Sequence, residues 1–140
     1  KQAAPAVKML LRRFGSSVRF AFRHFPLEDV HPHALGAAEA AEAAGAQGKF
    51  WEMHDLLFDN QSHLERTDLL AYARNIGLDV ERFTAELDGH AYVERIRADL
   101  ESGQRSGVRG TPGFFVNGTI QDVSFGLRSL FDAVDGALRQ

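Results

Sequence analysis

The stretch GVRGTPGFFVNG, residues 107–118, contains the signals that decide the fold. A proline between glycines, Pro112, comes directly before the apolar run Phe114–Val116. The dipeptide Asn117-Gly118 that follows is typical of a two-residue β-hairpin turn, in which both central residues need a positive φ. The pattern therefore predicts one short strand in the apolar run and a returning strand over residues 119–123.

Pro112 is the most informative position in this stretch. X-Pro bonds are cis in about 5–6% of folded cases, so the background is low. A cis bond here would turn the chain sharply and would present the backbone of Thr111 to a partner. The alternative is a trans proline at the start of an edge strand. The neighbouring glycines and hairpin favour the cis form over its background, and the local pattern leaves both forms open.

The segments on either side alternate between helix and strand. Residues 2–14 place apolar side chains at spacings of three and four and are followed by Gly15, which predicts a helix with a glycine cap. Residues 18–25, VRFAFRHF, alternate apolar and other side chains and end before Pro26, which predicts a strand. Residues 125–138 again have helical spacing.

A block of helices lies between the first predicted strand and the hairpin. The periodicity predicts helices over residues 33–46, 48–60, 67–76 and 80–87, and from about residue 92 to residue 103. Thr67 and Asp79 are the predicted N-caps of the third and fourth of these. The order of elements predicts an α/β fold in which a helical insertion interrupts the strands.

The composition excludes several classes of protein. A chain of 140 residues with 44% hydrophobic and 25% charged residues is typical of one soluble domain. The formal charge of −3 argues against a nucleic-acid binder that works through a general basic field. No apolar run approaches the roughly 18–20 residues of a membrane span. The absence of cysteine excludes disulfides and thiol catalysis by this chain as written.

Few residues suggest a metal or catalytic site. His31 and His33 invite a metal-binding interpretation, but zinc usually takes three or four protein ligands and no thiolate or carboxylate triad accompanies them. We therefore predict no metal, no cofactor and no catalytic residue in this chain. Acidic pairs such as Glu39 with Glu42 are predicted to be solvated. These signals alone predict an α/β domain with a helical insertion, and they assign it no function.

Two stretches together resemble the DsbA-like branch of the thioredoxin-fold oxidoreductases. One is RFAFRHFPLEDVHPHALGAAEAAEAAGAQGKFWEMHDLLF, residues 19–58, and the other is residues 107–118, which resemble the cis-proline loop and hairpin of that branch. The resemblance implies a thioredoxin-like sheet with a helical insertion in a single domain. Residues 1–30 and 107–140 would form the thioredoxin-like part, and residues 31–106 the insertion.

The resemblance also implies an activity and a binding loop. The family performs thiol–disulfide exchange through a Cys-x-x-Cys at the start of its first helix, whose N-terminus lowers the pKa of the attacking thiol. By resemblance, Pro112 is the cis-proline, and Gly110 and Thr111 complete the substrate-binding loop. The backbone of Thr111 would pair with an extended peptide. The implied partners are cysteine-containing proteins or peptides and a redox partner protein or small thiol.

The chain departs from the family at its beginning. Lys1 to Pro5 resemble the residues that follow the family's second cysteine, so both cysteines and an interior strand are absent. We expect a truncated oxidoreductase, inactive as given. The first core strand would lie between residues 18–25 and 113–117. Because unpaired strand edges are costly, we expect upstream residues, another chain or a rearranged sheet to fill its place.

The alternative is a redox-inactive module that keeps the peptide- or partner-binding surface. The family also occurs as a soluble domain fused to membrane transporters, so an appended regulatory role is compatible with the resemblance. In that case the loop around Pro112 and the apolar surface beside it would bind cysteine-free peptides. The sequence assigns no compartment, substrate or direction of the redox reaction.

Overall fold

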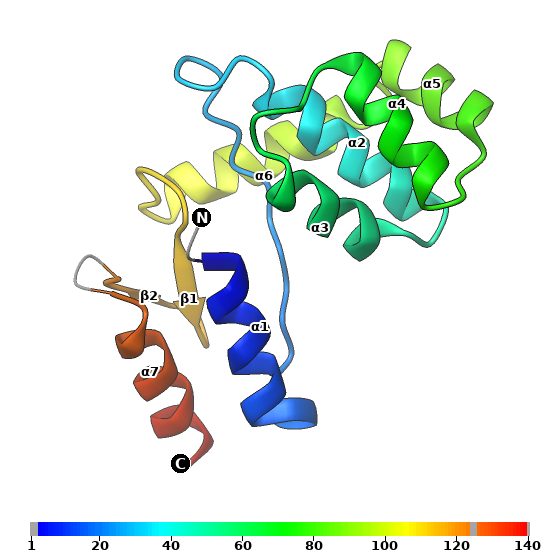
Figure 1. The fold of residues 1–140 in the computed structure, drawn as a ribbon. Coiled ribbons are helices and arrows are strands. Elements are labelled where there is room, and N and C mark those ends of the chain that lie inside the picture. Colours follow the sequence, from blue (N-terminus) through cyan, green and yellow to red (C-terminus); the bar gives the residue numbers. More distant parts are fainter. Residues whose placement is uncertain (1–2, 124–125, 140) are drawn as a thin grey trace. The chain divides into compact units, whose positions relative to one another are not determined.

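The computed structural model describes residues 3–123 and 126–139 (Figure 1). Its helices are α1 Ala3–Phe14, α2 Ala34–Ala46, α3 Phe50–Asp59, α4 Arg66–Asn75, α5 Val80–Asp88, α6 Val93–Arg105 and α7 Arg128–Leu138, and a 3-10 turn, η1, covers Gly15–Ser17. The strands are β1 Phe114–Val116 and β2 Thr119–Gln121. The chain divides into two compact units, which are described separately: unit 1 is Lys1–Phe22 with Val108–Gln140, and unit 2 is Arg23–Gly107.

Unit 1 contains the predicted hairpin. β1 and β2 are antiparallel, with Phe115 opposite Ile120 at the centre of the ladder. Asn117 has a φ of 49° and Gly118 a φ of 82°, the left-handed pair that a type I′ turn requires. The returning strand is two residues shorter than the predicted 119–123. Local turn chemistry therefore located the hairpin correctly.

Two helices pack on one face of this hairpin. Leu10 of α1 and Val134 of α7 are buried, and Phe114 of β1 packs against the same cluster. On the opposite face Phe115 is 42% exposed and its cross-strand neighbour Ile120 is 51% exposed. Residue 125, at which the last helix is predicted to begin, lies outside the described residues. The core of unit 1 thus lies between α1, α7 and a single face of the sheet.

Residues 18–25 do not form the predicted strand. The segment is extended at Val18 (φ −123°, ψ 134°), but the sheet of the described residues consists of β1 and β2. Burial still alternates as in a strand, because Val18, Phe20 and Phe22 are more buried than the residues between them. Hydrophobic burial selects which side of a segment faces the core, whereas a ladder needs a neighbouring backbone. The segment does not pair with β1, so the two are not direct neighbours in a sheet.

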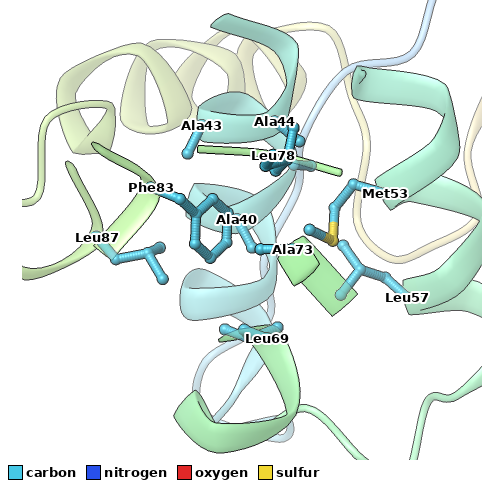
Figure 2. Packing of buried hydrophobic residues seen from close by; sticks show 11 residues of the cluster. Ala40, Ala43, Ala44, Met53, Leu57, Leu69, Ala73, Leu78, Phe83 and Leu87 are labelled. Atoms are coloured by element: carbon cyan, nitrogen blue, oxygen red, sulfur yellow. The ribbon is translucent and has the colours of Figure 1, made fainter. Parts of the chain in front are cut away.

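Unit 2 is built around an alanine face of α2. Ala40, Ala43 and Ala44 are fully buried. Figure 2 shows side chains from α3, α4 and α5 gathered around this face. They are Met53, Leu57, Leu69, Ala73, Phe83 and Leu87, together with Leu78 just before α5. Small alanine side chains let the neighbouring helices approach α2 closely, which explains why so alanine-rich a segment forms the centre of a core.

Of the two predicted N-caps, the structure confirms the one at α5 and contradicts the one at α4. The side chain of Asp79 accepts a hydrogen bond of 3.2 Å from the backbone N–H of Arg82, as predicted for the start of α5. Thr67 is not the cap of α4, because that helix begins one residue earlier with Glu65 as N-cap. The backbone N–H of Glu65 donates to Asp68 at 3.0 Å. This capping box satisfies the helix start and places it before the threonine.

Two acidic residues of α2 are paired, contrary to the prediction that they are solvated; Glu39 is buried and Glu42 is partly buried, at 14% exposure. Glu39 is 5% exposed, and its Oε1 lies 2.8 Å from Nδ1 of His90. Glu42 Oε1 lies 2.9 Å from Nε2 of the buried His24, and its Oε2 lies 3.4 Å from Nε of Arg95. The prediction was wrong because these partners lie 18 residues or more away in the sequence. Helical spacing gives no information about such distant partners.

A further polar cluster joins the end of α5 to the start of α6. The hydroxyl of Tyr92 donates to Glu86, and the same carboxylate accepts from Nε of Arg82 at 2.7 Å. The hydrogen bond to Glu86, partial burial and the negative charge of that carboxylate raise the pKa of Tyr92. The folded state therefore favours the neutral phenol.

We expect Phe83→Ala to lower the free energy of unfolding by about 3–5 kcal/mol, because a fully buried ring is replaced by a cavity. Urea unfolding followed by circular dichroism measures the change. Val30→Ala is the control in the same unit, since Val30 is 70% exposed and its loss should change stability by less than about 0.5 kcal/mol. Equal effects of the two substitutions would contradict the assignment of Phe83 to the buried core of unit 2.

The raised pKa of Tyr92 predicts a pH-dependent contribution to stability. Because the folded-state pKa lies above the unfolded value of about 10, the contribution is complete below that pH and is lost as the pH rises through the folded value. We expect Glu86→Gln to bring the pKa of Tyr92 back toward 10 in an ultraviolet titration. Tyr92→Phe assigns the titration to this residue. An unchanged Tyr92 titration in the Glu86 variant would refute the assigned cause.

Candidate peptide-binding site

The residues predicted to bind substrate form one exposed loop before β1. Gly110, Thr111 and Pro112 are all exposed, and the Thr111–Pro112 peptide bond is cis, as expected. No heavy atom beyond the chain neighbours lies within 4 Å of the position that a Cβ would take at Gly110. The loop is therefore open to solvent where an extended peptide would approach.

The backbone of Thr111 has unused hydrogen-bonding groups. Within the described part of the chain, neither its N–H nor its C=O is hydrogen-bonded to another residue. A little further along, β1 pairs with β2 on one edge, and no described strand pairs with its other edge. The exposed N–H and C=O of Thr111, rather than the edge of β1, are the groups with which an extended peptide could pair at this loop.

The N-terminus of α1 lies at the same end of unit 1 as this loop. Figure 1 shows α1 and β1 beginning at the same end, and Leu10 and Phe114 belong to one cluster. The first turn of α1 contains no acidic residue, so nothing there offsets the partial positive charge of a helix N-terminus. A thiolate placed at this end would be stabilised, and the pKa of its thiol would fall.

Comparison with known proteins identifies the family. Residues 11–138 match the family described as "DSBA-like thioredoxin domain". The chain belongs to this DsbA-like family. The match covers the extended segment, the helical block and the hairpin, so the α/β thioredoxin-like fold with a helical insertion is shown for this chain. No solved structure matches the chain significantly.

Relatives of this DsbA-like chain include much longer proteins named Na(+)/H(+) antiporter NhaA. Those of Salinispora arenicola and Salinispora tropica are 49% and 48% identical over 136 residues, which are 97% of this chain and 21% of each relative. The protein of Herminiimonas arsenicoxydans is 43% identical over 130 residues, 93% of this chain and 20% of the relative. The DsbA-like chain thus spans about a fifth of the length of these relatives.

The DsbA-like chain does not itself contain the nucleophile of thiol exchange, because its sequence has no cysteine. His31 and His33 are exposed just before α2. Across residues 3–123 and 126–139, no three His, Cys, Asp or Glu side chains form a group able to hold a metal ion. Over the same ranges no helix combines the length and apolar character needed to cross a bilayer.

A separation of charge between the two units was not predicted. Unit 1 contains eight Lys or Arg and three Asp or Glu residues, which give +5, whereas unit 2 contains eight and sixteen, which give −8. Together these charges give the −3 of the whole chain. That net value conceals the basic character of unit 1. The sequence contained a signal for this separation. Its first acidic residue is Glu28, and six Lys or Arg residues come before it.

We predict that His31 and His33 bind no structural metal, because they are not part of any group of three His, Cys, Asp or Glu side chains able to hold an ion within the described residues. Treatment with a chelator should leave the melting temperature unchanged, as measured by circular dichroism. The His31→Ala/His33→Ala double variant serves as the control and should show the same absence of response. A fall of several degrees with release of stoichiometric metal from the unsubstituted chain would reverse this conclusion.

Proposed function

We propose that this chain is the peptide-binding part of a thiol–disulfide oxidoreductase domain joined to a Na⁺/H⁺ antiporter. One observation carries the proposal: in a DsbA-like chain, an exposed loop in which the backbone of Thr111 makes no hydrogen bond within the described residues precedes β1. The antiporter is inferred from the relatives, because each match covers nearly all of this chain and only about a fifth of the relative.

The open edge of β1 supports a place for the cysteine-bearing segment. Residues 18–22 have the alternating burial of a strand without forming one. A strand placed between this segment and β1 would find backbone groups to bond on each side. If that strand led into α1, the cysteines would stand at the positive end of the helix. We therefore propose that residues outside the present 140 supply both the strand and the cysteine pair.

The proposed reaction is thiol–disulfide exchange. A domain thiolate attacks one sulfur of a substrate disulfide, the S–S bond breaks, and the second substrate sulfur leaves as a thiolate. The second domain cysteine then displaces the first substrate sulfur, so the substrate becomes a dithiol and the domain a disulfide. The reverse sequence oxidises the substrate. Hydrogen bonds to the backbone of Thr111 would hold the peptide so that its sulfur meets the thiolate.

The test uses the whole reading frame that contains this chain and a dithiol model peptide. We expect peptide oxidation or disulfide reduction that disappears when cysteines N-terminal to Lys1 are replaced by serine. Thr111→Pro removes one N–H donor and should raise KM for the peptide about tenfold, since a hydrogen bond contributes about 1–1.5 kcal/mol.

Thr111→Val is the matched control, because it keeps the N–H and changes the side chain alone. It should leave KM for the peptide nearly unchanged, and neither substitution should affect turnover of a small dithiol that makes no peptide contacts. A reading frame without a cysteine N-terminal to Lys1 would contradict the enzyme proposal. Equal effects of Val and Pro at this position would contradict the role of the backbone.

A second candidate is a redox-inactive peptide-binding module attached to the antiporter. The observation that favours it is the absence of cysteine from a sequence that keeps the loop and its exposed backbone. If this function is correct, the chain binds cysteine-free peptides, which fluorescence anisotropy measures. The whole protein must also show no thiol–disulfide exchange activity. Binding that Thr111→Pro does not weaken would exclude the loop as the peptide site.

A further inference from the structure

We propose that the outer face of α1 docks on an anionic phospholipid surface. Four exposed residues, Lys8, Met9, Arg12 and Arg13, share this face, because helical spacings of three, four and five residues bring them to one side. The opposite side of the helix carries the buried Leu10. The face is therefore a basic stripe on a helix whose apolar side is already engaged in the core of unit 1.

The charge of the stripe is not balanced by acids on its own helix. α1 contains no Asp or Glu, and none occurs in the sequence before Glu28. Unit 1 as a whole has a formal charge of +5. One of its three acids, Asp135, is paired with Arg139 at 3.0 Å. The guanidinium of Arg13 lies 5.3 Å from the centroid of the Phe14 ring, a cation–π contact that holds it at the end of the helix.

An exposed apolar residue within the stripe favours lipid over a soluble polyanion. Met9 is 60% exposed and stands among the three basic residues. At a bilayer, a side chain of this kind can enter the headgroup region while neighbouring cations meet lipid phosphates. A soluble polyanion offers no apolar phase to receive it. The combination of cations and an exposed thioether therefore matches an anionic bilayer surface.

The proposed attachment to an antiporter adds a second argument. A domain tethered to a membrane protein has a high effective concentration at the bilayer, so weak docking becomes significant. This argument alone rests on the proposed function. Each basic residue near an anionic surface contributes about a fivefold gain in binding, so a short stripe suits a tethered domain better than a free one.

Vesicle sedimentation of the 140-residue chain tests the docking. We expect the chain to bind vesicles that mix phosphatidylglycerol with phosphatidylcholine, to bind less as the salt concentration rises, and not to bind phosphatidylcholine alone. Arg12→Glu/Arg13→Glu should weaken binding by at least about 30-fold, because two cations are lost. Circular dichroism verifies that the charge-reversal variant is folded. If it is not, Arg12→Gln/Arg13→Gln replaces it, and we expect a loss of about 30-fold from that variant as well.

The matched control is Arg97→Glu/Arg105→Glu in α6 of unit 2. It changes the net charge equally, and Arg105 lies in the last turn of its helix, as Arg12 and Arg13 do in theirs. This control should retain binding. Equal losses in the two charge-reversal variants would overturn the assignment to α1, because they would show that net charge alone governs binding.

Met9→Ser distinguishes the lipid from a soluble polyanion. It should weaken vesicle binding several-fold and leave retention on a heparin column unchanged. If Met9→Ser has no effect on vesicles, or if no binding to phosphatidylglycerol vesicles occurs at low salt, the proposal is overturned. The assay contains no thiol chemistry, so its failure would leave the proposed oxidoreductase function intact.

Discussion

The pairing of backbone groups along β1 is the constraint on which unit 1 depends. A strand inside a sheet needs a neighbour on each edge, because unpaired N–H and C=O groups are costly when buried. β1 has β2 on one edge, and the described residues provide no strand for the other. The same hairpin fixes which β1 side chains meet α1 and α7, and it holds the Thr111 loop at one end of the unit. The proposed place of a missing strand derives from this edge, whereas the proposed peptide site derives from the backbone of Thr111 in the loop before β1.

Unit 2 meets a different physical requirement, which is to compensate acidic side chains that are buried or partly buried beside its alanine core. Glu39 and Glu42 lie on a helix whose alanines form the centre of the packing. Burying a carboxylate costs several kcal/mol unless a partner compensates it, and His90, His24 and Arg95 lie within pairing distance. These contacts tie α2 to the extended segment before it and to the loop and helix that follow α5.

The two surfaces proposed to act in unit 1 lie at different ends of α1. Arg12 and Arg13 are in the last turn of the helix, whereas the Thr111 loop stands at the end where the helix begins. Contact between the basic end and a bilayer would therefore leave the loop accessible to a peptide. The helical block of unit 2 carries the negative charge of the chain, which an anionic surface would repel.

The sequence by itself determined the features that depend on near neighbours. The Asn117-Gly118 turn, the cap at Asp79 and the helices to within a few residues follow from spacing and turn chemistry, and the family resemblance added the cis bond before Pro112. The tertiary structure alone decided that residues 18–25 lack a ladder and that Glu39 and Glu42 are paired. A local pattern reports which side of a segment is apolar. Ladders and ion pairs depend on what lies opposite, and that is set by residues distant in the chain.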